Sequence, residues 1–275
     1  TALKYLEYYV FVGCISLKKI AIPASVERIS SGAFYLCPKL TDVTIDPANK
    51  TFYMKGNCII ERETKTLVRG FTNSVIPTDG SVEIIGYNAF TGCDIIEAFI
   101  PDCVKEVQSG VFGNCYKLRK VTLPKGLTKI GYALFYGCES LERIAWSSGL
   151  KTIGNYAFAS CESLKSVYLP DSLITLGYGV FYHSSALESV RIGKNLETIG
   201  SSVFDECSKL NNLSFPKTLK RIGEMVFMEC KSLTSVSFEG TGAEWKAIEK
   251  DPYWKSSTGS FTVYCSDGNL TKSAA

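Results

Sequence analysis

The chain has 275 residues, of which 45% are hydrophobic and 21% are charged. This composition indicates a folded protein and excludes an intrinsically disordered one. The formal net charge of +3 is too small to predict a nucleic acid as partner.

The first predicted element opens a repeat that runs through most of the chain. Residues 3–6 form a short extended piece that leads into Phe11 and Cys14. One later copy of the repeat, at Phe181, keeps the phenylalanine but has Ser184 in place of the cysteine. The full Phe-x-x-Cys pair recurs, mostly 23 residues apart, at Phe34/Cys37, Phe90/Cys93, Phe112/Cys115, Phe135/Cys138, Phe158/Cys161, Phe204/Cys207 and Phe227/Cys230. A fixed period in this range is typical of a solenoid.

One side of each repeat is predicted to be a turn. In the copy at residues 149–171, residues 155–161 place Phe158 and Cys161 together on one side of a helical or 3₁₀ turn. The glycine before this turn recurs in other copies, which indicates a positive φ or a tight turn, at Gly86, Gly131, Gly154, Gly177, Gly200 and Gly223.

The other side of each repeat is predicted to be a strand. Residues 163–169 alternate as a half-buried strand does, with Val167 and Leu169 inward, and Pro170 ends it. Because one coil cannot bury its own apolar side, neighbouring coils must stack. We therefore predict an α/β solenoid: a right-handed coil of about 23 residues per repeat, with a parallel β-sheet on one face and short helical or 3₁₀ turns on the other.

Residues 46–80 interrupt the repeat. Two apolar runs, 57–60 and 66–68, flank a polar stretch at 61–65 as the arms of a hairpin do. Two interpretations stay open: a loop that packs on the edge of the coils, or a dedicated binding finger.

The repeat stops after Phe238. Thr241 and Glu244 form a capping box that opens a short helix with Trp245 on one face. Alternating apolar residues at 261–265 predict a closing strand. The aromatic side chains of this region are expected to form a lid over the last coil, with a ligand site as the alternative. The expected domains are a solenoid at 1–240 with segment 46–80 inserted, a C-terminal cap at 241–268 and a tail at 269–275.

The repeat Leu-x-x-Ile-Gly-x-x-Ala-Phe-x-x-Cys-x-x-Leu-x-x-Val-x-Leu-Pro resembles that of BspA-like leucine-rich repeat proteins over residues 3–238. The resemblance implies a leucine-rich repeat fold in a secreted or cell-surface protein of bacteria. It further implies adhesion to host extracellular proteins and no enzymatic activity. The chain begins inside the pattern, without a signal peptide or a polar cap, so we expect that residues before Thr1 are missing here.

The sequence contains no recognisable set of catalytic or metal-binding residues. His183 is the only histidine and lies at a predicted turn, so a Ser-His-Asp or Cys-His system has no other histidine to use. No Cys-x-x-Cys pair, phosphate-binding loop or EF-hand spacing occurs. We therefore expect no enzyme activity, no cofactor and no metal.

Eleven cysteines would ordinarily suggest disulfides in an extracellular protein. Eight of them belong to the Phe-x-x-Cys pairs, whose side chains point the same way in successive coils, and this is poor disulfide geometry. We expect these eight to be free and buried. Cys58, Cys103 and Cys265 lie outside the pairs, and Cys58 and Cys265 are predicted to be the more exposed.

The residues between the inward positions of each strand point outward from the sheet. Near the middle of the chain these outward slots hold aromatic and basic side chains, which are favoured at interfaces. We call them the outward strip: Phe99, Lys120, Arg143, Tyr168 and Arg191. The strip is the predicted site for a partner, and an ordinary solvated sheet face is the alternative.

The predicted function is non-enzymatic protein–protein interaction or adhesion, at a cell surface or outside the cell. The expected partner is a host extracellular matrix protein or another surface glycoprotein, bound by a monomer. No nucleic acid partner and no direct membrane insertion of this chain are expected. Two alternatives stay open: a structural spacer that displays another module, and a carbohydrate-binding surface built on exposed aromatics such as Phe99 and Tyr168.

Overall fold

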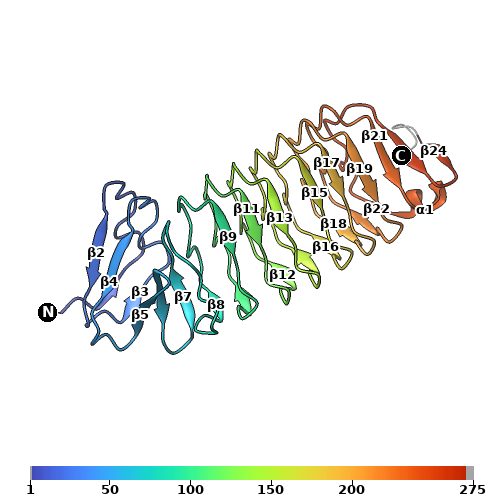
Figure 1. Cartoon of the computed structure of the whole chain (residues 1–275). Coiled ribbons are helices and arrows are strands. Elements are labelled where there is room, and N and C mark those ends of the chain that lie inside the picture. The colour runs from blue at the N-terminus through green and yellow to red at the C-terminus, as the bar shows by residue number, and fades with distance from the viewer. Residues whose placement is uncertain (1, 271–275) are drawn as a thin grey trace.

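The computed structural model of the chain describes residues 2–270. The molecule is an elongated stack of coils whose two ends lie far apart (Figure 1). Strands that lie one repeat apart in the sequence pair in parallel, and each regular coil gives one strand to each of two faces. The predicted fold class, a leucine-rich repeat solenoid with coils of about 23 residues, is confirmed.

The first of these two faces, which we call the sheet face, holds the predicted strands. Val167 is buried, while Ser166 and Tyr168 on either side of it are exposed, as alternation in a half-buried strand requires. The strands of the sheet face are β9 (Glu97–Phe99), β11 (Lys120–Thr122), β13 (Arg143–Ala145), β15 (Ser166–Tyr168), β17 (Ser189–Arg191), β19 (Asn212–Phe215) and β21 (Ser235–Phe238).

Each coil places a second, two-residue strand on another face. Ile153 lies opposite Ile130 in the neighbouring coil, and both side chains are buried, so this row forms a second wall of the core. Its strands are β8 (Ile84–Ile85), β10 (Glu106–Val107), β12 (Lys129–Ile130), β14 (Thr152–Ile153), β16 (Thr175–Leu176), β18 (Thr198–Ile199), β20 (Arg221–Ile222) and β22 (Glu249–Lys250).

The phenylalanines lie beneath the turns, where they stack from coil to coil. Phe158 lies between Phe135 and Phe181, with ring centroids 5.1 and 5.8 Å apart. The described turns in these coils are hydrogen-bonded turns and not helices. The reason is that alternate backbone amides of the turn bond to the next coil, as Phe135 N does in donating to Ala157 O at 2.8 Å. Tyr156, with φ of 55°, also leaves the helical region.

The recurring glycine allows successive coils to approach each other. A Cβ built on Gly200 would lie 2.6 Å from the carbonyl carbon of Gly177 in the preceding coil, and one on Gly223 would lie 2.5 Å from Ser201 N. None of the six glycines of this slot has a positive φ, so that part of the expectation was wrong. Close contact with the preceding coil, and not an unusual backbone conformation, requires glycine at four of the six positions: Gly154, Gly177, Gly200 and Gly223.

Replacing Gly200 with alanine is therefore expected to lower the free energy of unfolding by about 1–3 kcal/mol, because backbone atoms must move to admit the methyl group. Gly126→Ala is the matched control, since a Cβ there meets nothing within 4 Å. Urea denaturation of both variants checks this expectation. Equal stability of the two variants would contradict it.

Before the regular stack, the first coils form two small parallel sheets. β1 (Tyr5–Leu6) pairs with β3 (Arg28–Ile29), and β2 (Lys19–Ile22) pairs with β4 (Asp42–Ile45). Their buried residues form a core of their own, distinct from the core of the regular coils.

The inserted segment contributes β5 (Phe52–Lys55), β6 (Cys58–Glu61) and β7 (Thr66–Arg69). β6 pairs antiparallel with both neighbours, so the hairpin predicted between residues 57 and 68 is confirmed. β7 also pairs in parallel with β8, and the segment thereby continues the second face toward the first coils (Figure 1).

The last coil is followed by the predicted helix and strand. Helix α1 (Gly242–Ala247) begins with the capping box of Thr241 and Glu244, and its Trp245 is buried against Phe238. β23 (Thr262–Cys265) pairs in parallel with β21 and antiparallel with β24 (Gly268–Leu270). The division at 1–240, 241–268 and 269–275 stays a prediction, and residues 271–275 lie outside the described residues.

Candidate binding surface

The five residues of the outward strip all lie on the sheet face. Phe99 and Tyr168 are 59% and 64% exposed, Arg143 and Arg191 are exposed, and Lys120 is half-buried. Each comes from a different strand, from β9 to β17. The five side chains therefore lie on one face, as predicted. The role of the outward strip in binding stays a prediction.

Strand pairing divides the outward strip into two parts. Lys120 lies directly opposite Arg143, and Tyr168 lies directly opposite Arg191. β9, β11 and β13 form one sheet, whereas β15 begins a second sheet that continues to β24. Phe99, Lys120 and Arg143 thus share a short sheet with two open edges, and Tyr168 and Arg191 belong to the next one.

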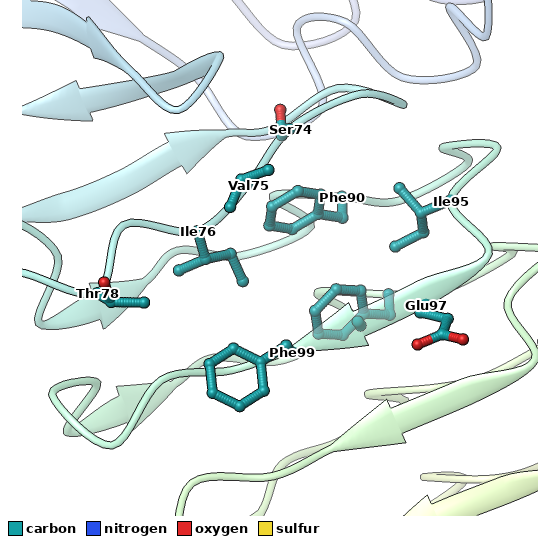
Figure 2. A pocket seen from close by; sticks show the side chains of 10 residues that line it. Ser74, Val75, Ile76, Thr78, Phe90, Ile95, Glu97 and Phe99 are labelled. Carbon is teal, nitrogen blue, oxygen red and sulfur yellow. The ribbon is translucent and has the colours of Figure 1, made fainter.

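A hollow of about 190 Å³ lies beside β9, at the first open edge of the short sheet (Figure 2). Figure 2 shows the ring of Phe99 on one side of it and Ile76 on the other, and Phe90 also lines it. Val75 and Ile76 belong to the segment inserted between residues 46 and 80, so this segment supplies one wall of the hollow. The structure thus brings the segment to the outward strip at Phe99.

A larger hollow, of about 400 Å³, lies at the second open edge, between β13 and β15. We call it the β13–β15 opening. Lys120, Arg143 and Tyr168 line it, so three of the five predicted residues meet at one place. Trp146 also lines it; this side chain is half-buried and packs against Phe158 in a T-shaped arrangement, with ring centroids 5.4 Å apart.

The charges around the β13–β15 opening leave an excess of positive charge. Glu142 accepts from Arg119 at 2.8 Å, and Glu97 lies 3.4 Å from Lys120. Arg143 has no ion pair within the described part of the chain. Its exposed guanidinium is therefore available to a carboxylate of a partner.

Trp146 and the Val75–Ile76 pair were not predicted as site residues. A signal for Trp146 was present, because it occupies the slot that holds Leu123 and Leu169 in neighbouring coils. Ser147 likewise replaces the proline that ends those strands. No comparable signal marked Val75 and Ile76, because their position depends on how the inserted segment folds back.

The cysteines of the Phe-x-x-Cys pairs act as hydrogen-bond donors between coils. Cys138 Sγ donates to Phe112 O at 3.1 Å, and Cys207 Sγ donates to Phe181 O at 3.1 Å. Ser184 Oγ makes the same bond to Phe158 O, also at 3.1 Å. The slot therefore selects a small side chain that can donate to a buried carbonyl, which explains why serine replaces cysteine there.

All eleven cysteines are free in the described structure. Cys58 is fully buried, so the prediction that it is exposed was wrong; its side chain belongs to the same buried core as Leu67 and Ile76. Cys265 and Cys103 are half-buried. Burial raises the pKa of the Cys58 thiol to about 12 and that of Cys230 also to about 12.

Buried thiols are therefore expected to resist alkylation in the native protein. A pKa near 12 lowers the thiolate fraction at pH 8 about a thousandfold, and only the thiolate reacts. Iodoacetamide should label Cys14, Cys103 and Cys265 first, and all eleven cysteines after unfolding without a reductant. Peptide mass spectrometry checks this, and thiols that stay blocked in the unfolded chain would reveal disulfides.

His183 lies in a turn, as expected, and its partners are carboxylates. Its Nδ1 lies 2.7 Å from Glu206 Oε2, and its Nε2 lies 3.8 Å from Glu162 Oε1. The hydrogen bond from His183 lowers the pKa of Glu206. Within residues 2–270, no group of three or more His, Cys, Asp or Glu side chains is placed to hold a metal ion. No helix in that range has the length and apolar character needed to cross a bilayer.

The chain matches the family model described as the BspA type leucine-rich repeat region. Six copies of the model match, over residues 1–61, 83–211 and 128–258. No curated protein matches the chain.

Several solved structures share this fold. A leucine-rich repeat protein of T. pallidum is 30% identical, with a TM-score of 0.56 over 68% of this chain and 90% of that one. A leucine-rich cell surface protein of Faecalibacterium prausnitzii is 24% identical, with a TM-score of 0.55 over 88% and 53%. The pneumococcal vaccine antigen PcpA is 23% identical, with a TM-score of 0.51 over 84% and 53%. The chain thus spans about half the length of the last two.

Proposed function

This chain belongs to the family of BspA-type leucine-rich repeat proteins, and from that membership we propose that it is a protein-interaction module of a bacterial surface or secreted protein. The module binds, as a monomer, a host extracellular protein such as a matrix protein or a surface glycoprotein. Two proteins of similar structure, a cell surface protein and a vaccine antigen, support the location. The proposal assigns a catalytic role to no residue.

The observation that carries this proposal is the exposure of the outward strip. Phe99 and Tyr168 expose large aromatic rings to solvent, and Arg143 and Arg191 are exposed without an ion pair among the described residues. Aromatic and arginine side chains are the usual anchors of protein interfaces. An outer sheet face with such side chains is an extended surface that a macromolecule can cover.

The test is binding of the purified chain to immobilised extracellular matrix proteins and glycans. A variant with Phe99→Ala, Tyr168→Ala and Arg191→Ala removes three anchors from the sheet face. A matched control with Tyr132→Ala, Tyr178→Ala and Lys129→Ala removes the same kinds of exposed side chain from other faces.

We expect saturable binding to one protein of the panel, weakened at least tenfold in the first variant and unchanged in the control. Both variants should melt like the parent, because exposed side chains contribute little to stability. Binding to glycans alone would favour the carbohydrate-binding alternative. No binding to any member of the panel, or an equal loss of binding in both variants, would count against the proposal and favour a structural spacer.

A further inference from the structure

We propose that the β13–β15 opening binds an extended, acidic peptide segment of the partner protein, whose backbone pairs with the open edge of β13. The inference rests on the proposed function, and it names the place and the chemistry of the contact. Its evidence is the missing strand pairing, the side chains of the opening and their charge.

The backbone of β13 lacks the pairing that neighbouring strands have. Between β15 and β17, the amides of Glu188 and Ser189 donate to Lys165 O at 2.8 and 3.3 Å. The corresponding bonds, from Lys165 and Ser166 to Glu142 O, are absent among the described residues. β13 and β15 accordingly fall in different sheets.

The unpaired groups of β13 point into the opening. In a strand, successive N–H and C=O groups face alternate neighbours. Arg143 N donates to Arg119 O at 3.1 Å, on the side of β11, so the polar backbone groups of Ile144 face β15. An open edge of this kind is a template for an added strand, which is a known mode of peptide recognition.

The missing pairing is local to the sheet face. On the second face the same two coils are joined by Lys151 N, which donates to Thr128 O at 2.8 Å. Beneath the turns, Phe135 and Phe158 stack with centroids 5.1 Å apart. The coils are therefore held together on two faces and open on the third, which gives a rigid site that does not need to form on binding.

The side chains of the opening suit an apolar or aromatic residue flanked by carboxylates. Ile144 and Trp146 are half-buried, whereas Val121 and Val167, in the slot of Ile144, are fully covered. A volume of about 400 Å³ lies within the range of ligand sites. Arg143, without an ion pair among residues 2–270, supplies a bidentate contact for a carboxylate.

The other open edge fits this role less well. The hollow beside β9 has about 190 Å³, and it is lined by Glu97 and partly walled by the inserted segment. A carboxylate lines each opening, so the smaller volume and the wall formed by the inserted segment set this edge apart. The β13 edge is therefore the one the structure favours.

The experiment uses a panel of capped, fluorescein-labelled heptapeptides in which glutamate alternates with valine, tyrosine or tryptophan. A second panel has lysine in place of glutamate, and a third has N-methylated backbone amides. Fluorescence anisotropy measures binding to the full chain at low salt. We expect glutamate peptides to bind at least tenfold more tightly than both other panels. The lysine peptides carry the opposite charge, and the N-methylated peptides cannot form the backbone hydrogen bonds.

Two variants locate the site. Arg143→Glu should weaken the binding of the glutamate peptides at least tenfold and strengthen the binding of the lysine peptides. Trp146→Leu, which introduces the residue that this slot holds in neighbouring coils, should weaken the binding of the glutamate peptides tenfold while the fold is kept. Lys129→Glu, the same charge reversal on another face of the same coil, should leave binding within twofold. A thermal melt confirms that each variant is folded.

Hydrogen exchange of the parent protein tests the backbone pairing directly. A bound glutamate peptide should slow exchange at the amide of Ile144. Equal binding of all three panels, or binding without this protection, would overturn the inference. If the whole protein still binds a matrix protein after Arg143→Glu and Trp146→Leu, the inference fails and the proposed function stands.

Discussion

Phe158→Ala is expected to lower the free energy of unfolding by about 3–5 kcal/mol, the range for truncating a buried phenylalanine. The ring is fully buried, with Phe135 and Phe181 stacked on its two sides and Trp146 against its edge. Removing it leaves a cavity that the rigidly spaced coils cannot close, because their backbones are hydrogen-bonded at a fixed separation.

The comparison with a terminal ring makes this prediction specific. Phe11 is only half-buried and stacks on a single phenylalanine, Phe34, at 5.4 Å. Phe11→Ala should therefore cost about half as much or less, since fewer contacts are lost. Denaturant titration of both variants measures the difference, with Tyr168→Ala as an exposed control expected within about 0.5 kcal/mol of the parent. Equal losses at Phe158 and Phe11 would contradict the stacking account.

The periodic part of the fold could be predicted because each coil repeats the same inward positions. Phe, Cys and the strand valines recur at fixed spacing, and this pattern places them in the core without reference to the rest of the chain. The outward slots follow from the same alternation, so the positions of Phe99 and Tyr168 on the sheet face could be predicted as well. The prediction of helical turns was wrong, because amides that bond to the next coil compete with helix formation.

Two features depended on information that spacing does not carry. A recurring glycine indicates either a positive φ or a close contact, and only the structure shows that Gly200 faces the backbone of Gly177. The β13–β15 opening depends on whether two strands pair, which the alternation within each strand does not determine. Only the tryptophan and the serine at 146 and 147 indicated that this coil differs.

The burial of Cys58 and the position of Arg69 were missed for a related reason. Both lie in the inserted segment, whose antiparallel hairpin has no equivalent in the regular coils. Alternation within a hairpin shows that it has two faces but not which face becomes covered. The packing of β6 between the two cores decides this, since Cys58 and Ile60 belong to one core and Ile59 belongs to the other.

Arg69→Met is expected to lower the free energy of unfolding by about 3 kcal/mol or more. Arg69 is 4% exposed, and its guanidinium donates to Phe34 O at 3.1 Å, Asn88 O at 3.1 Å and Thr91 O at 3.2 Å. Methionine fills a similar space but leaves these buried carbonyls without that donor. Asn88 O keeps the amide of Thr91 as donor, whereas Phe34 O and Thr91 O lose their donor, and each such unsatisfied buried group costs about 1–3 kcal/mol.

The loss of stability should affect mainly the first coils. Phe34 belongs to the core of the N-terminal coils, whereas Asn88 and Thr91 belong to the first regular coil, so Arg69 joins the two parts. Without it, the N-terminal coils should unfold before the regular stack. Calorimetry should therefore resolve two transitions in the variant and one in the parent. Arg62→Met is the control, because Arg62 is exposed on the same segment, over the ring of Tyr53. A single transition at the parent's midpoint would show that Arg69 does not couple the two cores.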